Sequence, residues 1–146
     1  MSCNQRHNDN KSFDKEVVRQ EMKNLVMSYG QAVEKMDIEK TIIHFNDDTE
    51  FYVYSDGRHF TYDEIKESVK NEFFTGLKKI ELNWDTMNVR AIDEKEAVCF
   101  AILNQTLLDS ADNTIKVRVE ATFVGVKKDD TWKIAYVHSR HELKTN

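Results

Sequence analysis

The chain has 146 residues, the usual size of a single domain, and that length supports a hydrophobic core without metal or disulfide cross-links. Hydrophobic residues make up 40% and charged residues 32%, with no proline and only 4 glycines, which excludes disordered, collagen-like and Gly- or Pro-rich classes. The net charge is −5 and the charges are interspersed. The sequence therefore predicts no nucleic-acid partner, because such a surface needs concentrated basic residues. No apolar stretch approaches the roughly 20 residues that a membrane span requires.

We expect residues 1–12 to form a disordered polar tail and residues 13–146 to form one domain. The two cysteines, Cys3 and Cys99, lie in that tail and in an apolar strand pattern, so we expect no disulfide and a cytoplasmic location. The polar segment that begins at Cys3 is also similar to the start of a mature bacterial lipoprotein, which gives an extracytoplasmic alternative if a signal peptide is removed there. No Cys or His spacing indicates a metal, and no motif indicates a cofactor.

Two helices are predicted at the start of the domain. Apolar residues three and four apart from Val18 to Val33 predict a helix that ends near Met36. Asp14 is its expected N-cap, and Asp37 is the expected N-cap of a short second helix.

A strand and a third helix should follow. The β-branched and aromatic segment 49–54 predicts a strand, which Asp56-Gly57 turns. Thr61 with Glu64 three residues later predicts a capping box, so a helix should begin there and end before Gly76.

The second half of the chain predicts four long antiparallel strands. They cover 80–91, 97–108, 114–126 and 132–143, and a shift of the apolar phase predicts a bulge at Asp85-Thr86. Helices followed by a strand meander define the α+β class. We expect three helices packed in a strongly bent, mostly antiparallel sheet, and a cone of this shape has a mouth that can hold a ligand.

Three segments carry a resemblance to a known family. The helical segment 29–38 leads on to His44-Phe45-Asn46-Asp47-Asp48-Thr49, and the last strand contains Trp132-Lys133-Ile134 followed by His138. Both patterns are similar to those of the nuclear transport factor 2-like superfamily, in its SnoaL-like and ketosteroid-isomerase-homologue branch, which has a cystatin-like cone. Segment 104–109 resembles the association domain of calcium/calmodulin-dependent kinase II, a related branch. The resemblance covers about residues 14–143 and implies the fold more strongly than a function.

The resemblance also implies which residues to compare with the isomerase. Tyr29 matches the tyrosine that donates a hydrogen bond to the steroid oxyanion, although its place on an apolar helix stripe also fits simple core packing. Val53 stands where the isomerase has its carboxylate base, and Ala121 matches the second acid. The neighbouring Glu120 should point to the opposite face of its strand. Since valine cannot abstract a proton, the sequence predicts no steroid isomerase activity.

Strand alternation predicts which residues face the inside of the cone. In the kinase association domain the positions of Leu103, Phe123 and Ser139 carry pocket arginines, so a carboxylate-binding pocket of that type is not expected here. The predicted ligand-binding lining is apolar with a few hydrogen-bonding groups, as in small-molecule sites. It comprises Tyr29, Val53, Trp84, Cys99, Ala101, Leu103, Gln105, Ala121, Phe123, Val137, Ser139 and His141.

Two lining residues are the weak candidates for catalysis. His141 has the titratable ring that an acid, a base or a ligand anchor needs, although it also fits a rim position without a role. Tyr29 is the second candidate. Cys99 has no neighbouring base and fits inert packing. We therefore expect a domain that binds a small apolar ligand, with an isomerase, dehydratase or cyclase acting on an apolar ring compound as the alternative.

The outer face of the sheet is predicted to be apolar as well. Phe100, Ile102, Ile134 and Tyr136 should lie there, whereas an exposed antiparallel face is normally polar. A second copy of the chain is the expected cover, which gives a homodimer. An oligomeric association module is a further alternative function.

Overall fold

The computed structural model describes residues 12–144. Residues 1–11 of the predicted tail, Cys3 among them, lie outside this range, whereas its last residue, Ser12, lies inside it. The elements are α1 (Lys15–Glu34), α2 (Ile38–Ile43), β1 (Tyr52–Ser55), β2 (Arg58–Thr61), α3 (Tyr62–Asn71), β3 (Leu77–Ala91), β4 (Glu96–Asp109), β5 (Thr114–Lys128) and β6 (Thr131–Leu143).

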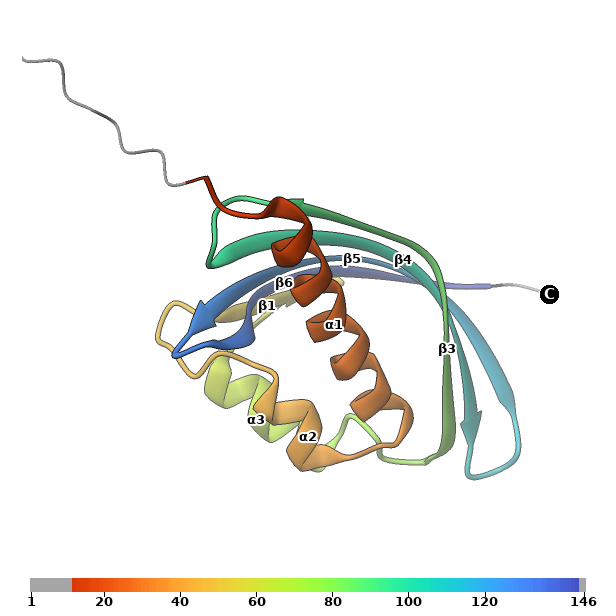
Figure 1. Ribbon diagram of the computed structural model, residues 1–146. Helices are drawn as coiled ribbons and strands as arrows, with labels where there is room; N and C mark the ends of the chain where they lie inside the picture. The colour runs from red at the N-terminus through yellow and green to blue at the C-terminus, as the bar shows by residue number, and fades with distance from the viewer. Residues whose placement is uncertain (1–11, 145–146) are drawn as a thin grey trace, which may run out of the picture.

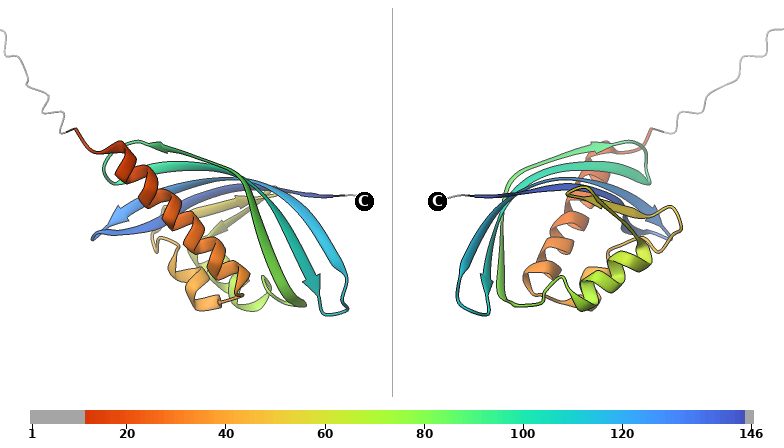
Figure 2. Two further views of the ribbon diagram at one scale, coloured as in Figure 1. Left: turned by 45° about the vertical axis from the view of Figure 1, so that its right-hand side comes forward. Right: turned by 180° about the vertical axis from the view of Figure 1, so that it is seen from behind.

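One strongly curved sheet carries the fold. Its six strands are ordered β2-β1-β6-β5-β4-β3, and every neighbouring pair is antiparallel except β1 with β6. The three helices lie on the concave side of the sheet, with α1 running diagonally across it and α2 and α3 opposite the β1–β2 hairpin (Figures 1 and 2). The expected α+β fold with helices inside a bent, mostly antiparallel sheet is confirmed.

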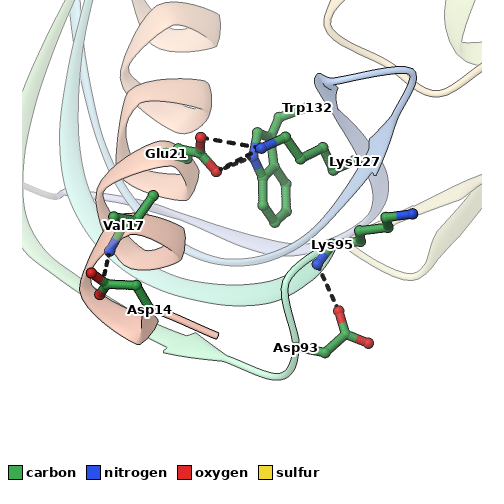
Figure 3. Close-up of polar contacts among 7 residues, drawn as sticks. All are labelled: Asp14, Val17, Glu21, Asp93, Lys95, Lys127 and Trp132. Carbon is green, nitrogen blue, oxygen red and sulfur yellow. Dashed lines mark hydrogen bonds and ion pairs between the residues drawn. The ribbon is translucent and has the colours of Figure 1, made fainter. Parts of the chain in front are cut away.

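The predicted caps begin all three helices. The Asp14 carboxylate accepts the backbone N–H groups of Glu16 and Val17, at 3.0 and 3.3 Å (Figure 3). Asp37 does the same for α2. Thr61 and Glu64 form the reciprocal capping box at the start of α3. Each cap satisfies N–H groups that the first turn of a helix leaves without partners.

The region between α2 and α3 differs from expectation in its boundaries. The first strand begins at Tyr52, because the Asp48 carboxylate accepts the N–H of Glu50 and turns the chain before it. Asp56 and Gly57 both have positive φ, 49° and 83°, as a two-residue hairpin turn requires. The turn therefore leads into β2, a four-residue strand that sequence analysis did not predict.

Two bulges bend the long strands, besides a register shift at the start of β3 between Leu77 and Lys79. One lies between Trp84 and Thr86, as predicted from the shift in apolar phase. The second leaves Ala135 of β6 without a partner in β5 and moves the following residues by one position. Ile134 consequently points inward and is fully buried, so its predicted place on the outer face was wrong. Tyr136 lies beyond the bulge and keeps its outward direction.

Helix α1 is fastened to the β5–β6 hairpin by one carboxylate. Glu21 accepts the indole N–H of Trp132 at 2.8 Å and the Lys127 ammonium at 3.2 Å (Figure 3). In strand β5 of the same hairpin, Gly125 lies so close to Met22 that a β-carbon there would be 2.4 Å from the Met22 sulfur. The tryptophan of the Trp-Lys-Ile motif thus holds the helix against the sheet.

Candidate functional site

A cavity of about 200 Å³ lies inside the curve of the sheet. Its walls come from α1, α3, the β1–β2 hairpin and the inner face of β4, β5 and β6. The lining is apolar except for a few hydroxyl, amide and imidazole groups, and no lysine or arginine among residues 12–144 contributes to it. A cavity of roughly 150 Å³ lined by apolar side chains is large enough to bind benzene, so this one fits a small ring compound.

The structure brings most of the predicted lining residues to this cavity. They share the inward direction of their strands or of α1. The nine that line it are Tyr29, Val53, Leu103, Gln105, Ala121, Phe123, Val137, Ser139 and His141.

Three predicted residues lie away from the cavity, because α1 fills the space above them. Cys99 and Ala101 are fully buried in the hydrophobic core. The Trp84 ring packs against the backbone of Gly30, where a β-carbon would be 2.7 Å from its Cζ2 atom. The expectation that these side chains line the site was wrong, since alternation gives the face of a strand but not the helix that covers it.

Sequence reasoning missed the part of the lining that α3 and the β1–β2 hairpin supply. Ile65 and Ser68, three residues apart on one face of α3, line the cavity together with Phe60 and Ser55. The helical spacing of Ile65 and Ser68 was a usable signal. What the sequence lacked was the position of α3, which lies across the cavity from the long strands.

Tyr29 enters the cavity from α1. Its ring packs edge-on or tilted against Phe45 and Phe123, with centroids 5.5 and 6.1 Å apart. Burial raises the pKa of Tyr29 to about 12, because the phenolate would lose its hydration. No group of residues 12–144 forms a hydrogen bond with its hydroxyl, so a neutral donor is available to a ligand at physiological pH.

Polar groups meet where β1 runs parallel to β6. Ser55 is paired with Ser139 in the sheet, and the two hydroxyls are 2.9 Å apart. Asp56 follows at the hairpin turn. One of its carboxylate oxygens accepts the backbone N–H of His141 at 2.8 Å, and the other lies 2.7 Å from the His141 ring Nδ1. The Asp56–His141 pair stands at the mouth of the cavity, with both side chains partly exposed.

The surroundings of Asp56 keep it ionised. Burial by itself raises the pKa of this carboxyl, but the hydrogen bonds from the His141 backbone and ring and the charge of His141 outweigh it, so the pKa is lowered. An ionised carboxylate only accepts hydrogen bonds. The Nδ1 of His141 must therefore carry the hydrogen, and its Nε2 is the free basic nitrogen whenever the ring is neutral.

The other residues considered as reactive or metal-binding groups offer little. Burial raises the pKa of the Cys99 thiol to about 11, which fits inert packing. Residues 12–144 contain no group of three or more His, Cys, Asp or Glu side chains arranged to hold a metal ion. In the same range, no helix combines the length and apolarity that crossing a bilayer demands.

A family model covers most of the chain. Residues 18–142 match the model of the calcium/calmodulin dependent protein kinase II association domain, and the chain belongs to this family. The family has a nuclear transport factor 2-like fold, as the sequence resemblance implied. No curated protein matches the chain in sequence.

Solved structures support the same fold at low sequence identity. A nuclear transport factor 2-like superfamily protein from Salmonella enterica has a TM-score of 0.77 and 19% identity, covering 90% of this chain and 95% of its own. Hexachlorocyclohexane dehydrochlorinase LinA-type3 from Novosphingobium barchaimii has a TM-score of 0.75 and 11% identity, covering 88% and 90%. A protein with a cystatin-like fold from Caulobacter vibrioides has a TM-score of 0.65 and 16% identity, covering 84% and 88%.

Proposed function

We propose that this protein binds a small, neutral, apolar ring compound in the cavity inside the curved sheet. The observation that carries the proposal is a space of about 200 Å³ whose walls are apolar apart from a few placed polar groups. A domain that served stability alone would fill such a space, since voids cost stability. A filled cavity would instead favour a purely associative module.

The charges around the cavity indicate the chemistry of the ligand. By the sequence resemblance, Leu103, Phe123 and Ser139 occupy positions where the kinase association domain carries arginines. The cavity lining contains no lysine or arginine, and its one imidazole, that of His141, is already paired with Asp56, so an anionic ligand would meet no free countercharge there. The Tyr29 hydroxyl can donate a hydrogen bond to a ligand, and Gln105 and the three lining serines offer further polar groups. The ligand should therefore be uncharged and carry at least one hydrogen-bond acceptor.

Ligand-detected NMR with acetophenone, 2-naphthol and benzoate tests this proposal. We expect the two neutral compounds to bind and benzoate to bind much more weakly. Ala121→Leu fills the cavity and should abolish binding, whereas Ala111→Leu, in the exposed turn between β4 and β5, should leave it unchanged. Equal binding to both variants would contradict a ligand site in the cavity.

The steroid isomerase reaction is not part of the proposed function. Val53 lines the cavity at the position where the isomerase has its carboxylate base, and a buried valine offers no group that takes a proton. We expect no measurable isomerisation of a 3-oxo-Δ5-steroid, followed by ultraviolet absorbance.

We further propose a homodimer through the convex face of the sheet. Phe100, Tyr52 and Tyr54 lie on that face with 40%, 40% and 41% of their surface exposed, and Tyr136 packs against Tyr52 there. No helix among residues 12–144 covers them. A second copy of the chain would bury these aromatic rings, and membership of a family named for association supports this.

Analytical ultracentrifugation at micromolar concentration tests the dimer. Phe100→Asp should convert the dimer to a monomer, because it places an unpaired charge in a dry interface. Ile115→Asp removes another partly exposed apolar side chain, at the far end of β5, and should leave the dimer intact. A monomeric parent protein would contradict the proposal.

A further inference from the structure

We propose that Asp56 and His141 form a base at the cavity mouth that removes a proton from carbon in a small ring compound. The inference rests on the proposed ligand cavity and names the chemistry done there. It is motivated by one contact, the 2.7 Å approach of the Asp56 carboxylate to Nδ1 of His141.

The fold holds Asp56 in place for this role. It occupies the first position of the two-residue turn after β1, with φ of 49°. Three bonds tie it to β6: its backbone N–H donates to the Ser139 carbonyl at 3.1 Å, and its carboxylate receives the His141 backbone N–H and ring Nδ1. Asp56 is therefore a positioning residue, since it does not line the cavity itself.

The orientation of His141 makes its free nitrogen useful. Because Nδ1 is engaged by a carboxylate, Nε2 is the nitrogen without a hydrogen when the ring is neutral, and His141 is one of the residues that line the cavity. His138, three residues earlier in β6, lies on the opposite face with its ring edge against Tyr54, 5.4 Å between centroids. The strand thus separates one histidine with access to the cavity from one without it.

Tyr29, which lines the same cavity from α1, completes the arrangement. A proton removed from carbon leaves an electron pair that must settle on a leaving atom or an adjacent oxygen. The neutral Tyr29 hydroxyl lines the same cavity and can donate a hydrogen bond to that atom. The substrate class is a small ring compound with an acidic C–H bond next to a bond that breaks in an elimination. A dehydrochlorinase among the structural neighbours shares the fold.

The elimination of 5-nitrobenzisoxazole is a suitable probe. The C3–H bond breaks and its proton moves to Nε2 of His141. The C–H electron pair forms the third bond of a nitrile, and the N–O bond breaks with its electron pair on the phenolate oxygen. The product, 2-cyano-4-nitrophenolate, is coloured, so no other reactant or indicator is needed.

We expect the protein to accelerate this reaction above an equal concentration of free imidazole. His141→Ala should lower kcat/KM by about a hundredfold or more, and added imidazole should restore part of the rate. Asp56→Asn should lower kcat by about tenfold or more with KM nearly unchanged, because the ring loses its fixed tautomer. His138→Gln should match the parent. Thermal melts of each variant establish that it is folded.

Two outcomes overturn the inference. One is a parent rate no higher than that of imidazole, and the other is a folded His141→Ala variant with undiminished rate. Binding of 5-nitroindazole, which is neutral, has a similar shape and has no N–O bond to break, separates the two proposals. If it binds without turnover of the probe, the base is wrong and the ligand cavity stands. If it does not bind, and the neutral rings tested by NMR do not bind either, the ligand cavity is wrong as well.

Discussion

The concave face of the sheet has two regions with similar side chains and different outcomes. Under α1, the inner residues Ala97, Cys99, Ala101 and Ile134 have no exposed surface at all. Beyond α1, residues of the same apolar type, such as Leu103 and Val137, line a cavity.

The covering element explains the difference. Helix α1 lies directly on the first region. Its backbone at Gly30 contacts the Trp84 ring, and its Met22 side chain contacts Gly125 of β5. The second region is bounded by α3, which stands across from the long strands, and by the β1–β2 hairpin, which continues the sheet beyond β6. One register row, Ala101–Ala121–Ser139, crosses from the packed region into the open one. The composition of a sheet face therefore does not decide whether it holds a ligand.

The largest effect is expected from Met22→Ala in the packed region. The side chain is fully buried between α1 and the sheet, so its removal leaves a void and should lower the free energy of unfolding by about 2–5 kcal/mol. Urea titration followed by circular dichroism measures this. A loss under about 1 kcal/mol would show that the region under α1 is loosely packed.

The register partners Ala101 and Ala121 compare the two regions directly. Ala101→Leu should cost about 1–3 kcal/mol, because α1 leaves no room for three more carbons. Ala121→Leu should change stability by less than about 1 kcal/mol, since its new atoms enter the cavity. Both are measured by chemical denaturation beside the parent. Equal costs at the two sites would remove the distinction between the regions.

Tyr29 lies between the packed region and the cavity, and its ionisation at alkaline pH tests whether its hydroxyl is shielded from water. Its pKa is raised by burial from 10.0 to about 12, so the folded state keeps the proton that the unfolded state releases. This contribution to stability is complete below pH 10 and is lost as the pH rises to 12. Ultraviolet titration should show a tyrosine ionising near pH 12 that is missing from Tyr29→Phe. Its ionisation near pH 10 would mean that the hydroxyl is hydrated.

The smallest effect concerns the attachment of α1. The pKa of Glu21 is lowered, chiefly by the hydrogen bond from the Trp132 indole and then by Lys127, with burial opposing. A lowered carboxyl pKa adds stability above its unfolded value, near 4.5, and that stability is lost as the pH falls through the folded value. Glu21→Gln should cost about 1 kcal/mol or less at neutral pH and weaken the acid dependence of unfolding below pH 4.5. An unchanged acid dependence would contradict this.

The features that the sequence predicted well are those set by local chemistry. Asp14, Asp37 and the Thr61–Glu64 pair are read from neighbouring residues, and each begins its helix as expected. The bulge after Trp84 follows from a change of apolar phase within one strand. The helices inside a bent sheet then follow from the order of the elements.

The wrong predictions concern features that depend on contacts between residues far apart in the sequence. The bulge at Ala135 leaves no mark in the alternation of β6 and is defined by its pairing with β5, so Ile134 was assigned to the wrong face. Trp84, Cys99 and Ala101 have the inward direction that alternation predicts, but the path of α1 removes them from the cavity. Asp56 was recognised as a turn residue, yet its partner lies 85 positions later in the chain.

The parallel pairing of β1 with β6 has a consequence for how the protein folds. Both sides of the cavity mouth depend on this pair, because Ser55 and Asp56 meet Ser139 and His141 only when the last strand is in place. During synthesis from the N-terminus, the helices and the β1–β2 hairpin emerge long before that partner does. Closing a loop of this length makes the pairing a late and slow step, as contacts between remote segments generally are. A chain that stopped before β6 would leave one edge of β1 and the apolar wall of the cavity open, a surface suited to aggregation.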